Sequence, residues 1–317
     1  MILAVVLAAT LQQELLRVAA GMDGRVGICA VEVGQHQAVC VRGSERFSLQ
    51  SVMKLVVAAA VFDAVDRRVI TLTDVVVVKP GDASPGPQEF ANRVRAEGSL
   101  RMTIDQLVRL AVNDSDSTAV DVLVARLGGV GEVQGFLRRR QVEHLRVDRD
   151  ERTLQAETSG LRWRPDLADD RRFDQASRAV PVVERDAAWA AYLTDVRDTV
   201  TPEGMVGFLS RLAKGELLSA DSTRQLLAIL EDTRTAPDRL RAGTPPAWRL
   251  GNKTGTSGAW RGMTATTNDV GLMTLPDGRR VAVAVFVAES RRSNAERAAA
   301  IAAVARLVAA AHQPRQE

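Results

Sequence analysis

Strand patterns lie near both ends of the chain, and helical patterns fill the residues between them. Apolar and polar residues alternate in 26–41, around a turn near Gly34 to His36, and again in three segments towards the C-terminus. The last two of these segments meet at the hairpin signal Asp277-Gly278. Strands from both ends bury their apolar faces most simply in one sheet. The C-terminal strand segments are 247–257, 264–276 and 279–290, followed by a helix over 293–311.

This order predicts an α/β fold with an additional all-α lobe. We expect an antiparallel sheet built from both chain ends and flanked by helices, an inserted helical lobe, and an active site in the cleft between lobes. Helical periodicity begins at Ser51, and Pro202 and Ser219 mark later helix starts. The expected lobes are 11–48 with 200–317, and 49–199.

Composition and the N-terminus exclude some classes of function. The chain has 317 residues, 46% of them hydrophobic, which is enough to bury a substantial core. Its 42 basic and 39 acidic residues give a net charge of only +3, so no nucleic-acid partner is indicated. Residues 1–10 resemble a truncated signal peptide or, alternatively, the first turns of a terminal helix, and they are too short to span a membrane.

The two cysteines lie on the two N-terminal strand segments. Cys29 and Cys40 would face each other across a two-residue turn. In an exported chain they could form a disulfide, and two buried free thiols fit the pattern equally well. Neither cysteine has the spacing of a metal site, and no metal or organic cofactor is indicated.

Ser51 stands three residues before Lys54 at the start of an apolar helical run. Only four of the 42 basic residues are lysines, so the chain uses arginine where it needs only positive charge. Arginine cannot replace a lysine that must give up a proton, because the guanidinium pKa is above about 12. Residues three apart on a helix share a face, so Lys54 can reach the Ser51 hydroxyl. We interpret the pair as a nucleophile and base rather than a helix cap and a surface charge.

Two further motifs follow in a fixed order. Residues 115–117 read Ser-Asp-Ser on a turn that opens a helix, where capping alone would also explain them. Residues 253–256 read Lys-Thr-Gly-Thr on a strand edge. Ser-x-x-Lys, Ser-Asp-x and Lys-Thr-Gly in this order are the signature of the penicillin-recognising serine enzymes.

A fourth segment separates hydrolases from transpeptidases. Glu151, Leu154 and Gln155, preceded by Arg149, resemble the glutamate-containing omega loop of class A serine β-lactamases, and Asp198 resembles the acid that pairs with the arginine. From about residue 11 to 310 the chain resembles a class A serine β-lactamase with an extended omega loop over about 149–198. We therefore expect a periplasmic or secreted monomer that acts on a small-molecule β-lactam.

The resemblance implies a role for each matched residue. Ser51 attacks the lactam carbonyl, and its proton passes to Lys54 or, through a water, to Glu151. Glu151 activates the deacylating water, while Ser115 passes a proton to the leaving nitrogen beside Lys253. The backbone N–H groups of Ser51 and Thr256 form the oxyanion hole. The implied substrate-binding residues are Ser117, Gln155, Thr254, Gly255, Thr256 and Arg239, with Arg261 as the alternative to Arg239.

Three departures from the family pattern bear on substrate and rate. Ser117 stands where the family usually has Asn, whose amide holds the substrate's acylamino side chain, so water or another side chain must fill the gap. Gln155 replaces the usual Asn that shares the hydrolytic water with Glu151. Between Gln155 and Asp198 lies an insertion of about thirty residues. Its aromatic residues either pack it onto the helical lobe or line the cleft; they are Trp163, Phe173, Trp189 and Tyr192.

Two other functions share part of this pattern. A penicillin-binding DD-peptidase or slow acyl-trap shares Ser51, Lys54, Ser115 and Lys253 but lacks a competent Glu151, so it differs in deacylation. A non-catalytic domain that binds β-lactams or peptidoglycan would keep the cleft without turnover. The pattern as a whole favours hydrolysis of the β-lactam amide bond, and so antibiotic resistance.

Overall fold

The computed structural model describes residues 2–35, 37–86 and 88–312, with only the backbone for residues 2–8. Residue 1 of the expected signal segment and His36 of the expected turn lie outside the described residues. The described chain forms two compact units. The first, here called the sheet unit, lies within residues 1–52, 142–145 and 199–317, and the second, the helical unit, comprises 53–141 and 146–198.

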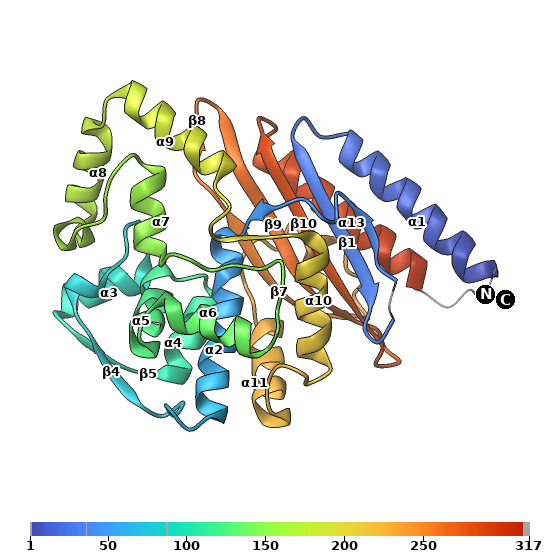
Figure 1. The fold of residues 1–317 in the computed structure, drawn as a ribbon, viewed down its shortest axis with the longest axis horizontal. Coiled ribbons are helices and arrows are strands. Elements are labelled where there is room, and N and C mark those ends of the chain that lie inside the picture. The colour runs from blue at the N-terminus through green and yellow to red at the C-terminus, as the bar shows by residue number, and fades with distance from the viewer. Residues whose placement is uncertain (1, 36, 87, 313–317) are drawn as a thin grey trace. The chain divides into compact units, whose positions relative to one another are not determined.

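The sheet unit contains one antiparallel sheet with strand order β2-β1-β10-β9-β7, and β8 pairs with β9 (Figure 1). β1 pairs with β10 from Arg25↔Ala288 to Glu32↔Val281, which confirms the prediction of a sheet built from both chain ends. The strands are β1 Arg25–Glu32, β2 Val39–Val41, β7 Arg249–Thr256, β8 Ala259–Trp260, β9 Met263–Thr274 and β10 Arg280–Ser290, with a separate pair β3 Phe47–Ser48 and β6 Thr199–Val200.

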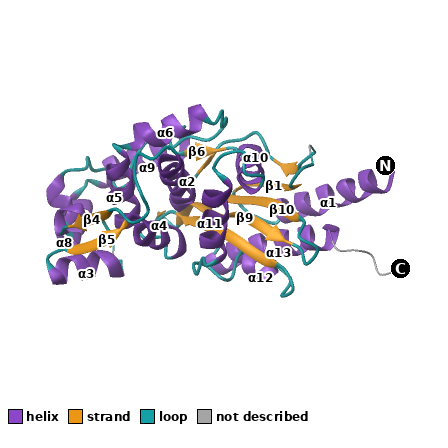
Figure 2. Cartoon of the chain, turned by 90° about the horizontal axis from the view of Figure 1, so that it is seen from below, coloured by secondary structure: helices purple, strands orange, loops and turns teal. Residues whose placement is uncertain are grey.

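Helices cover both faces of this sheet (Figure 2). Val281, Val283 and Val285 alternate along β10 and join a core with residues of α1 and α13, while Phe286 points to the other face and stacks on Phe47. The predicted helix start at Pro202 and cap at Ser219 are both confirmed. The helices are α1 Ile2–Ala20, α10 Pro202–Ala213, α11 Ala220–Glu231, α12 Leu240–Gly243 and α13 Asn294–His312.

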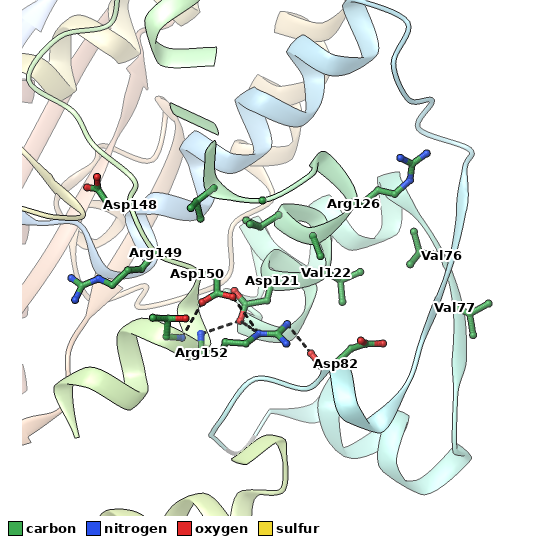
Figure 3. A pocket seen from close by; sticks show the side chains of 15 residues that line it. Val76, Val77, Asp82, Asp121, Val122, Arg126, Asp148, Arg149, Asp150 and Arg152 are labelled. Atoms are coloured by element: carbon green, nitrogen blue, oxygen red, sulfur yellow. Dashed lines mark hydrogen bonds and ion pairs between the residues drawn. The ribbon is translucent and has the colours of Figure 1, made fainter. Parts of the chain in front are cut away.

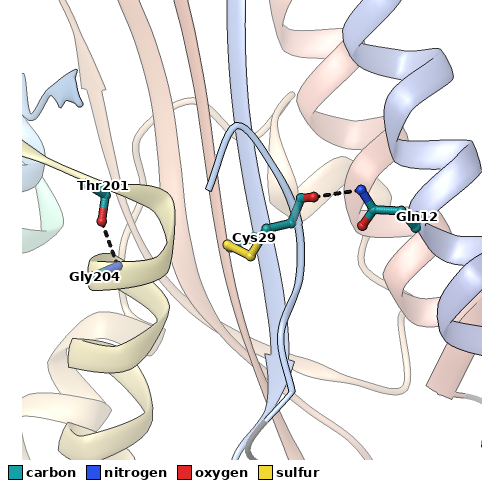
Figure 4. Close-up of a disulfide and its surroundings, with 5 residues drawn as sticks. Gln12, Cys29, Thr201 and Gly204 are labelled. Atoms are coloured by element: carbon teal, nitrogen blue, oxygen red, sulfur yellow. Dashed lines mark hydrogen bonds between the residues drawn. A yellow bond between two sulfur atoms is a disulfide. The ribbon is translucent and has the colours of Figure 1, made fainter. Parts of the chain in front are cut away.

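A disulfide joins the first two strands of the sheet unit. Cys29 on β1 lies opposite Cys40 on β2, with their Cα atoms 4.2 Å apart, and the two sulfur atoms are bonded (Figure 4). Gln12 on α1 donates to the Cys40 carbonyl at 2.7 Å. Of the two states that the sequence left open, the structure contains the disulfide.

The helical unit holds most of the predicted middle helices and one ladder that the sequence did not predict. The run of β-branched residues Val75–Val78 forms β4, which pairs with β5, because such residues favour extended backbone. The segment 79–99, which is rich in Pro and Gly, contains α3. The elements are α2 Met53–Asp66, β4, α3 Glu89–Glu97, β5 Leu100–Thr103, α4 Ile104–Asn113, α5 Ser117–Leu127, α6 Val130–Arg139, α7 Glu151–Thr158, α8 Asp170–Ala179 and α9 Val182–Thr194.

Helix α2 is buried around its whole circumference from Met53 to Ala64. Its first turn carries Lys54, so this helix fixes one predicted catalytic side chain inside the helical unit. Within the described residues, none of the helices has the length and apolar character that crossing a bilayer requires.

Candidate active site

Ser51 lies in a 3₁₀ turn, η1 Gln50–Val52, in the sheet unit. The prediction of an α-helix beginning at Ser51 is wrong by two residues, because Val52 N–H donates to Leu49 O at 3.1 Å and closes the tighter turn. Gln50 has a φ of 47°, a left-handed conformation that non-glycine residues rarely adopt. Strain of this kind persists only where the surrounding structure holds it, as at many functional sites.

Strand β7 runs directly against this turn. A Cβ atom on Gly255 would lie 2.7 Å from the carbonyl oxygen of Leu49 and 3.2 Å from the nitrogen of Ser51, so only glycine fits. Asn268 on β9, opposite Gly255 in register, donates to the carbonyls of Ser48 at 2.8 Å and Leu49 at 3.1 Å. Contacts to the main chain therefore hold the turn that carries Ser51 against β7.

Two buried cations accompany β7. Lys253 is fully buried, and its Nζ donates to the carbonyl of Thr254 at 3.0 Å. Arg239 precedes α12 and donates from Nη2 to Thr256 Oγ1 at 2.6 Å; burial lowers the pKa of its guanidinium. Arg261, the alternative arginine, is exposed in the turn between β8 and β9. The contact with Thr256 therefore distinguishes Arg239 from Arg261.

A buried acid that the sequence reasoning missed lies beside these cations. Asp269 on β9 accepts from Asn252 Nδ2 at 2.8 Å and from the backbone N–H of Leu240 at 3.1 Å. Burial raises the pKa of Asp269 to about 7, although Arg239 and Lys253 favour its ionised form. Arg239 therefore has two acids near it, Asp269 and Asp238, and Lys253 lies close enough to Asp269 to favour its ionised form.

Lys54 and Glu151 form a buried ion pair in the helical unit. Lys54 Nζ lies 3.1 Å from Glu151 Oε1, and both side chains are almost fully buried. Glu151 is the first residue of α7, where Asp150 caps the helix by accepting from Thr153 N–H at 3.0 Å. One turn later, Gln155 donates from Nε2 to Glu151 Oε2 at 3.2 Å. The structure therefore brings three predicted site residues together here.

The Ser-Asp-Ser turn lies next to the same lysine. Lys54 Nζ donates to the Ser115 carbonyl at 2.6 Å and to Ser117 Oγ at 3.0 Å. Ser115 has a φ of 60°, and Asp116, the cap of α5, has a pKa raised by burial although Lys54 lowers it. Ser117 Oγ also accepts from Gln88 Nε2 at 3.2 Å. Gln88, which the sequence reasoning did not identify, contacts Ser117 where the family's Asn is missing.

Glu151 is also held by an acid that the sequence reasoning missed. Asp121 on α5 accepts from the backbone N–H of Glu151 at 2.8 Å and from Arg152 at 3.0 Å (N–H) and 3.1 Å (Nε). The Ser84 hydroxyl donates to the same carboxylate at 2.5 Å. Burial raises the pKa of Asp121 to about 6. A lone acid within the apolar run "STAVDVLV" was the available signal.

Arg149 and Asp198 close the segment that contains the insertion. Arg149 Nε donates to Asp198 Oδ2 at 2.6 Å, and the backbone N–H of Arg149 donates to Asp198 Oδ1 at 3.0 Å. Arg149 also pairs with Glu157 at 2.6 Å and Asp195 at 3.2 Å. These contacts join the residues before α7 to those after α9.

The insertion contains two helices, α8 and α9. Trp189 and Tyr192 on α9 are buried with ring centroids 6.0 Å apart, and α9 packs on α7. The guanidinium carbon of Arg152 lies over the Trp163 ring, 5.5 Å from the ring centroid. Phe173 on α8 is half-buried. These contacts agree with the interpretation that the aromatic residues pack the insertion onto the helical unit.

A cavity of about 610 Å³ lies in the helical unit beside Asp121. Figure 3 shows Asp121, Asp150 and Arg152 together on one side and Val76 and Val77 across from them. Its lining residues do not include the Lys54 to Glu151 pair. We therefore place the candidate chemistry at that ion pair and not in this cavity.

Comparisons with known proteins agree with this arrangement. A family model described as the β-lactamase enzyme family matches residues 10–312. The chain is 26% identical to β-lactamase VEB-1 of Pseudomonas aeruginosa over 86% of this chain and 80% of that protein. It is 28% identical to β-lactamase CTX-M-25 of Escherichia coli over 94% of this chain and 87% of that protein.

Solved structures give the same result. An ancestral class A β-lactamase, that of the last common ancestor of Gram-negative bacteria, matches with 31% identity and a TM-score of 0.75 over 95% of this chain and 99% of that chain. A β-lactamase from Chitinophaga pinensis matches with 26% identity and a TM-score of 0.79 over 96% and 100%. The chain therefore belongs to the β-lactamase enzyme family, as a hydrolase of class A.

Proposed function

We propose that this enzyme hydrolyses the amide bond of β-lactam antibiotics through an acyl-enzyme on Ser51. The Ser51 oxygen attacks the lactam carbonyl carbon, and its proton passes to Lys54, or through a water to Glu151. The carbon–nitrogen bond of the ring breaks, and Ser115 passes a proton to the leaving nitrogen beside Lys253. The backbone N–H groups of Ser51 and Thr256 stabilise the oxyanion, where one such donor typically contributes about 3 kcal/mol.

Deacylation then consumes one water. Glu151 takes a proton from that water, whose oxygen attacks the ester carbonyl; the ester bond breaks, and Ser51 regains its proton. Gln155 orients the water together with Glu151. Arg239, Thr254 and Thr256 bind the carboxylate that β-lactams carry, with Gly255 supplying the close approach of β7. Hydrolysis of such drugs would give antibiotic resistance.

The observation that carries this proposal is the buried contact between Lys54 and Glu151. A buried ammonium and carboxylate are costly to keep unless geometry compensates, and here Nζ and Oε1 are 3.1 Å apart with further polar partners on each side. Such a pair can exchange a proton during catalysis. A DD-peptidase or acyl-trap has no need of a carboxylate at this place.

The test is the hydrolysis of a chromogenic cephalosporin by the parent enzyme and by Glu151→Ala. We expect continuous turnover by the parent. For Glu151→Ala we expect one stoichiometric burst followed by turnover about a thousandfold slower, because a general base contributes on that order. Glu97→Ala, which removes an exposed glutamate of α3 in the same unit, is the matched control.

Two results would contradict the proposal. A burst without turnover by the parent would move the enzyme to the penicillin-binding or acyl-trap class. Equal turnover by the parent and Glu151→Ala would remove Glu151 from deacylation. Mass spectrometry of the burst product identifies Ser51 as the acylated residue, and acylation elsewhere would refute its role.

We also propose that the enzyme works in the periplasm or outside the cell as a monomer. The disulfide between Cys29 and Cys40 supports this location, because disulfides persist in oxidising compartments. Fractionation of cells that express the natural gene, with thiol labelling of the recovered enzyme, tests the location. Enzyme found reduced in the cytosolic fraction would contradict it.

A further inference from the structure

The carboxamide of Gln88 lies against the first turn of α5, beside Ser117. Its Oε1 accepts from the backbone N–H of Ser117 at 2.8 Å and of Thr118 at 3.4 Å. The first N–H groups of a helix have no partner inside it, and the Asp116 carboxylate accepts from that of Ala119 at 2.7 Å and also interacts with that of Thr118. Gln88 therefore completes the cap of α5 from a segment 29 residues earlier in the chain.

This cap determines which way the carboxamide faces. The atom that lies against two backbone N–H groups must be the carbonyl oxygen, because an NH₂ group there would place donors against donors. The NH₂ group of Gln88 is consequently on the side of the Ser117 hydroxyl, to which it donates at 3.2 Å. Gln88 is only half-buried, so the residue is not sealed inside the helical unit.

The Ser117 hydroxyl has two donors around it. It accepts from Lys54 Nζ at 3.0 Å as well as from Gln88, and its side chain is almost fully buried. An asparagine at position 117 would offer both an acceptor for Lys54 and an NH₂ donor for a ligand. In this chain Ser117 supplies the acceptor, and the NH₂ donor lies one hydrogen bond away on Gln88.

We propose that Gln88 is a substrate-binding residue that donates its second amide N–H to the carbonyl oxygen of the substrate's acylamino side chain. The inference rests on the proposed function. Penicillins and cephalosporins carry this acylamino group on the ring carbon next to the lactam carbonyl. In the proposed mechanism Lys54 acts at the lactam carbonyl, and Ser117 is bonded to both Lys54 and Gln88, so the Gln88 amide is the donor that we assign to this neighbouring group.

Two substrates that differ in this group test the inference. Benzylpenicillin has the acylamino carbonyl, and 6-aminopenicillanic acid has a free amine in its place. We expect Gln88→Ala to lower kcat/KM for benzylpenicillin about three- to tenfold, the usual contribution of one neutral hydrogen bond, with little change for 6-aminopenicillanic acid. Adding Ser117→Asn to Gln88→Ala should restore the preference for benzylpenicillin.

Gln106→Ala is the matched control. Gln106 is exposed and caps α4 in the same unit by accepting from the Thr103 N–H at 2.9 Å, so its loss should leave both substrates unchanged. If Gln88→Ala folds poorly, Gln88→Glu keeps an oxygen for the α5 cap and removes the NH₂ donor, and the same selective loss is expected.

The failures of the two proposals are distinguishable. An equal fall of kcat/KM for both substrates in Gln88→Ala and Gln88→Glu would show that Gln88 only caps α5, and would overturn the inference. No loss for benzylpenicillin in either variant would overturn it too. A parent enzyme that turns over neither substrate contradicts the proposed function itself.

Discussion

The sheet unit and the helical unit hold their candidate site residues in different ways. In the sheet unit, contacts to the main chain hold the turn that carries Ser51. Gly255 lies against the carbonyl of Leu49 and the nitrogen of Ser51, and Asn268 donates to the carbonyls of Ser48 and Leu49. In the helical unit, side chains hold Glu151 in place. The Asp121 carboxylate accepts from the backbone N–H of Glu151, and Lys54 pairs with the Glu151 carboxylate.

The difference predicts two kinds of sensitivity. A close approach of two main chains fails when any atom is added between them, and it does not depend on pH. A network around a buried carboxylate fails when an acceptor is lost, and it responds to protonation because burial raises the pKa of that group. In the proposed mechanism the first kind bears on acylation by Ser51 and the second on deacylation by Glu151.

Among the variants that test this comparison, the largest effect is expected for Gly255→Val, which adds atoms where the Cβ alone would lie 2.7 Å from Leu49 O. Overpacking costs about 1–3 kcal/mol of unfolding free energy, and a displacement of about 1 Å at a nucleophile can slow the reaction about a hundredfold. We expect a loss of acylation rate of this size for a chromogenic cephalosporin, measured by stopped flow, with a lower Tm.

Gly258→Ala controls for loss of glycine as such. A Cβ atom on Gly258 meets no described atom within 4 Å, and this residue lies in the exposed turn after β7. Wild-type acylation by Gly255→Val would contradict the argument that β7 and the Ser51 turn fit only without a side chain.

Asp121→Asn should act on the other step. The amide keeps one acceptor oxygen but turns an NH₂ group towards donors that Asp121 now accepts, so the backbone N–H of Glu151 or of Arg152 loses its partner. We expect deacylation to slow about tenfold, since an unsatisfied buried group costs about 1–3 kcal/mol. Acylation should change much less, and pre-steady-state bursts separate the two steps. A variant slowed in acylation alone would contradict the comparison.

Asp121→Asn should also change how the stability of the folded protein depends on pH. The pKa of Asp121 is raised from 3.8 to about 6 in the folded protein, so the folded state binds this proton more tightly than the unfolded state. The contribution of Asp121 to stability therefore falls as pH rises from about 4 to about 6. The Tm of the parent relative to Asp121→Asn should be higher at pH 5 than at pH 7. The opposite trend would show that the carboxylate is stabilised in the folded state.

Short motifs made part of the fold and site predictable from sequence. The strands at both chain ends had clear alternation of apolar and polar residues. The Lys-Thr-Gly motif identified Gly255, which lies where the main chain of the Ser51 turn leaves no room for a side chain. Asp121 had a local signal, a lone acid in an apolar run, whereas Asp269 follows the polar residues Thr267 and Asn268 and had none. The charges beside each acid are set by distant residues. No period or composition in the sequence signals such neighbours.

Gln88 had no such signal. It lies in a Pro/Gly-rich stretch, and its contact with Ser117 depends on where that stretch runs over α5. The start of α2 was misplaced for a related reason, because the turn before Met53 is set by Gly255 and Asn268 from the far end of the chain. Side-chain contacts between distant segments follow from tertiary packing and not from local pattern.

The smallest effect is expected where the insertion meets this network. Trp163 lies under the guanidinium of Arg152, whose Nε donates to Asp121. An exposed cation–π contact contributes about 0.5–1 kcal/mol, so Trp163→Leu should lower the Tm slightly and leave kcat within about twofold. If the ring only supports Arg152, the ratio of kcat/KM between benzylpenicillin and a bulky cephalosporin stays constant. A changed ratio with an unchanged Tm would mean that the ring contacts substrate, and the insertion would then belong to the binding site and not to the support of Glu151.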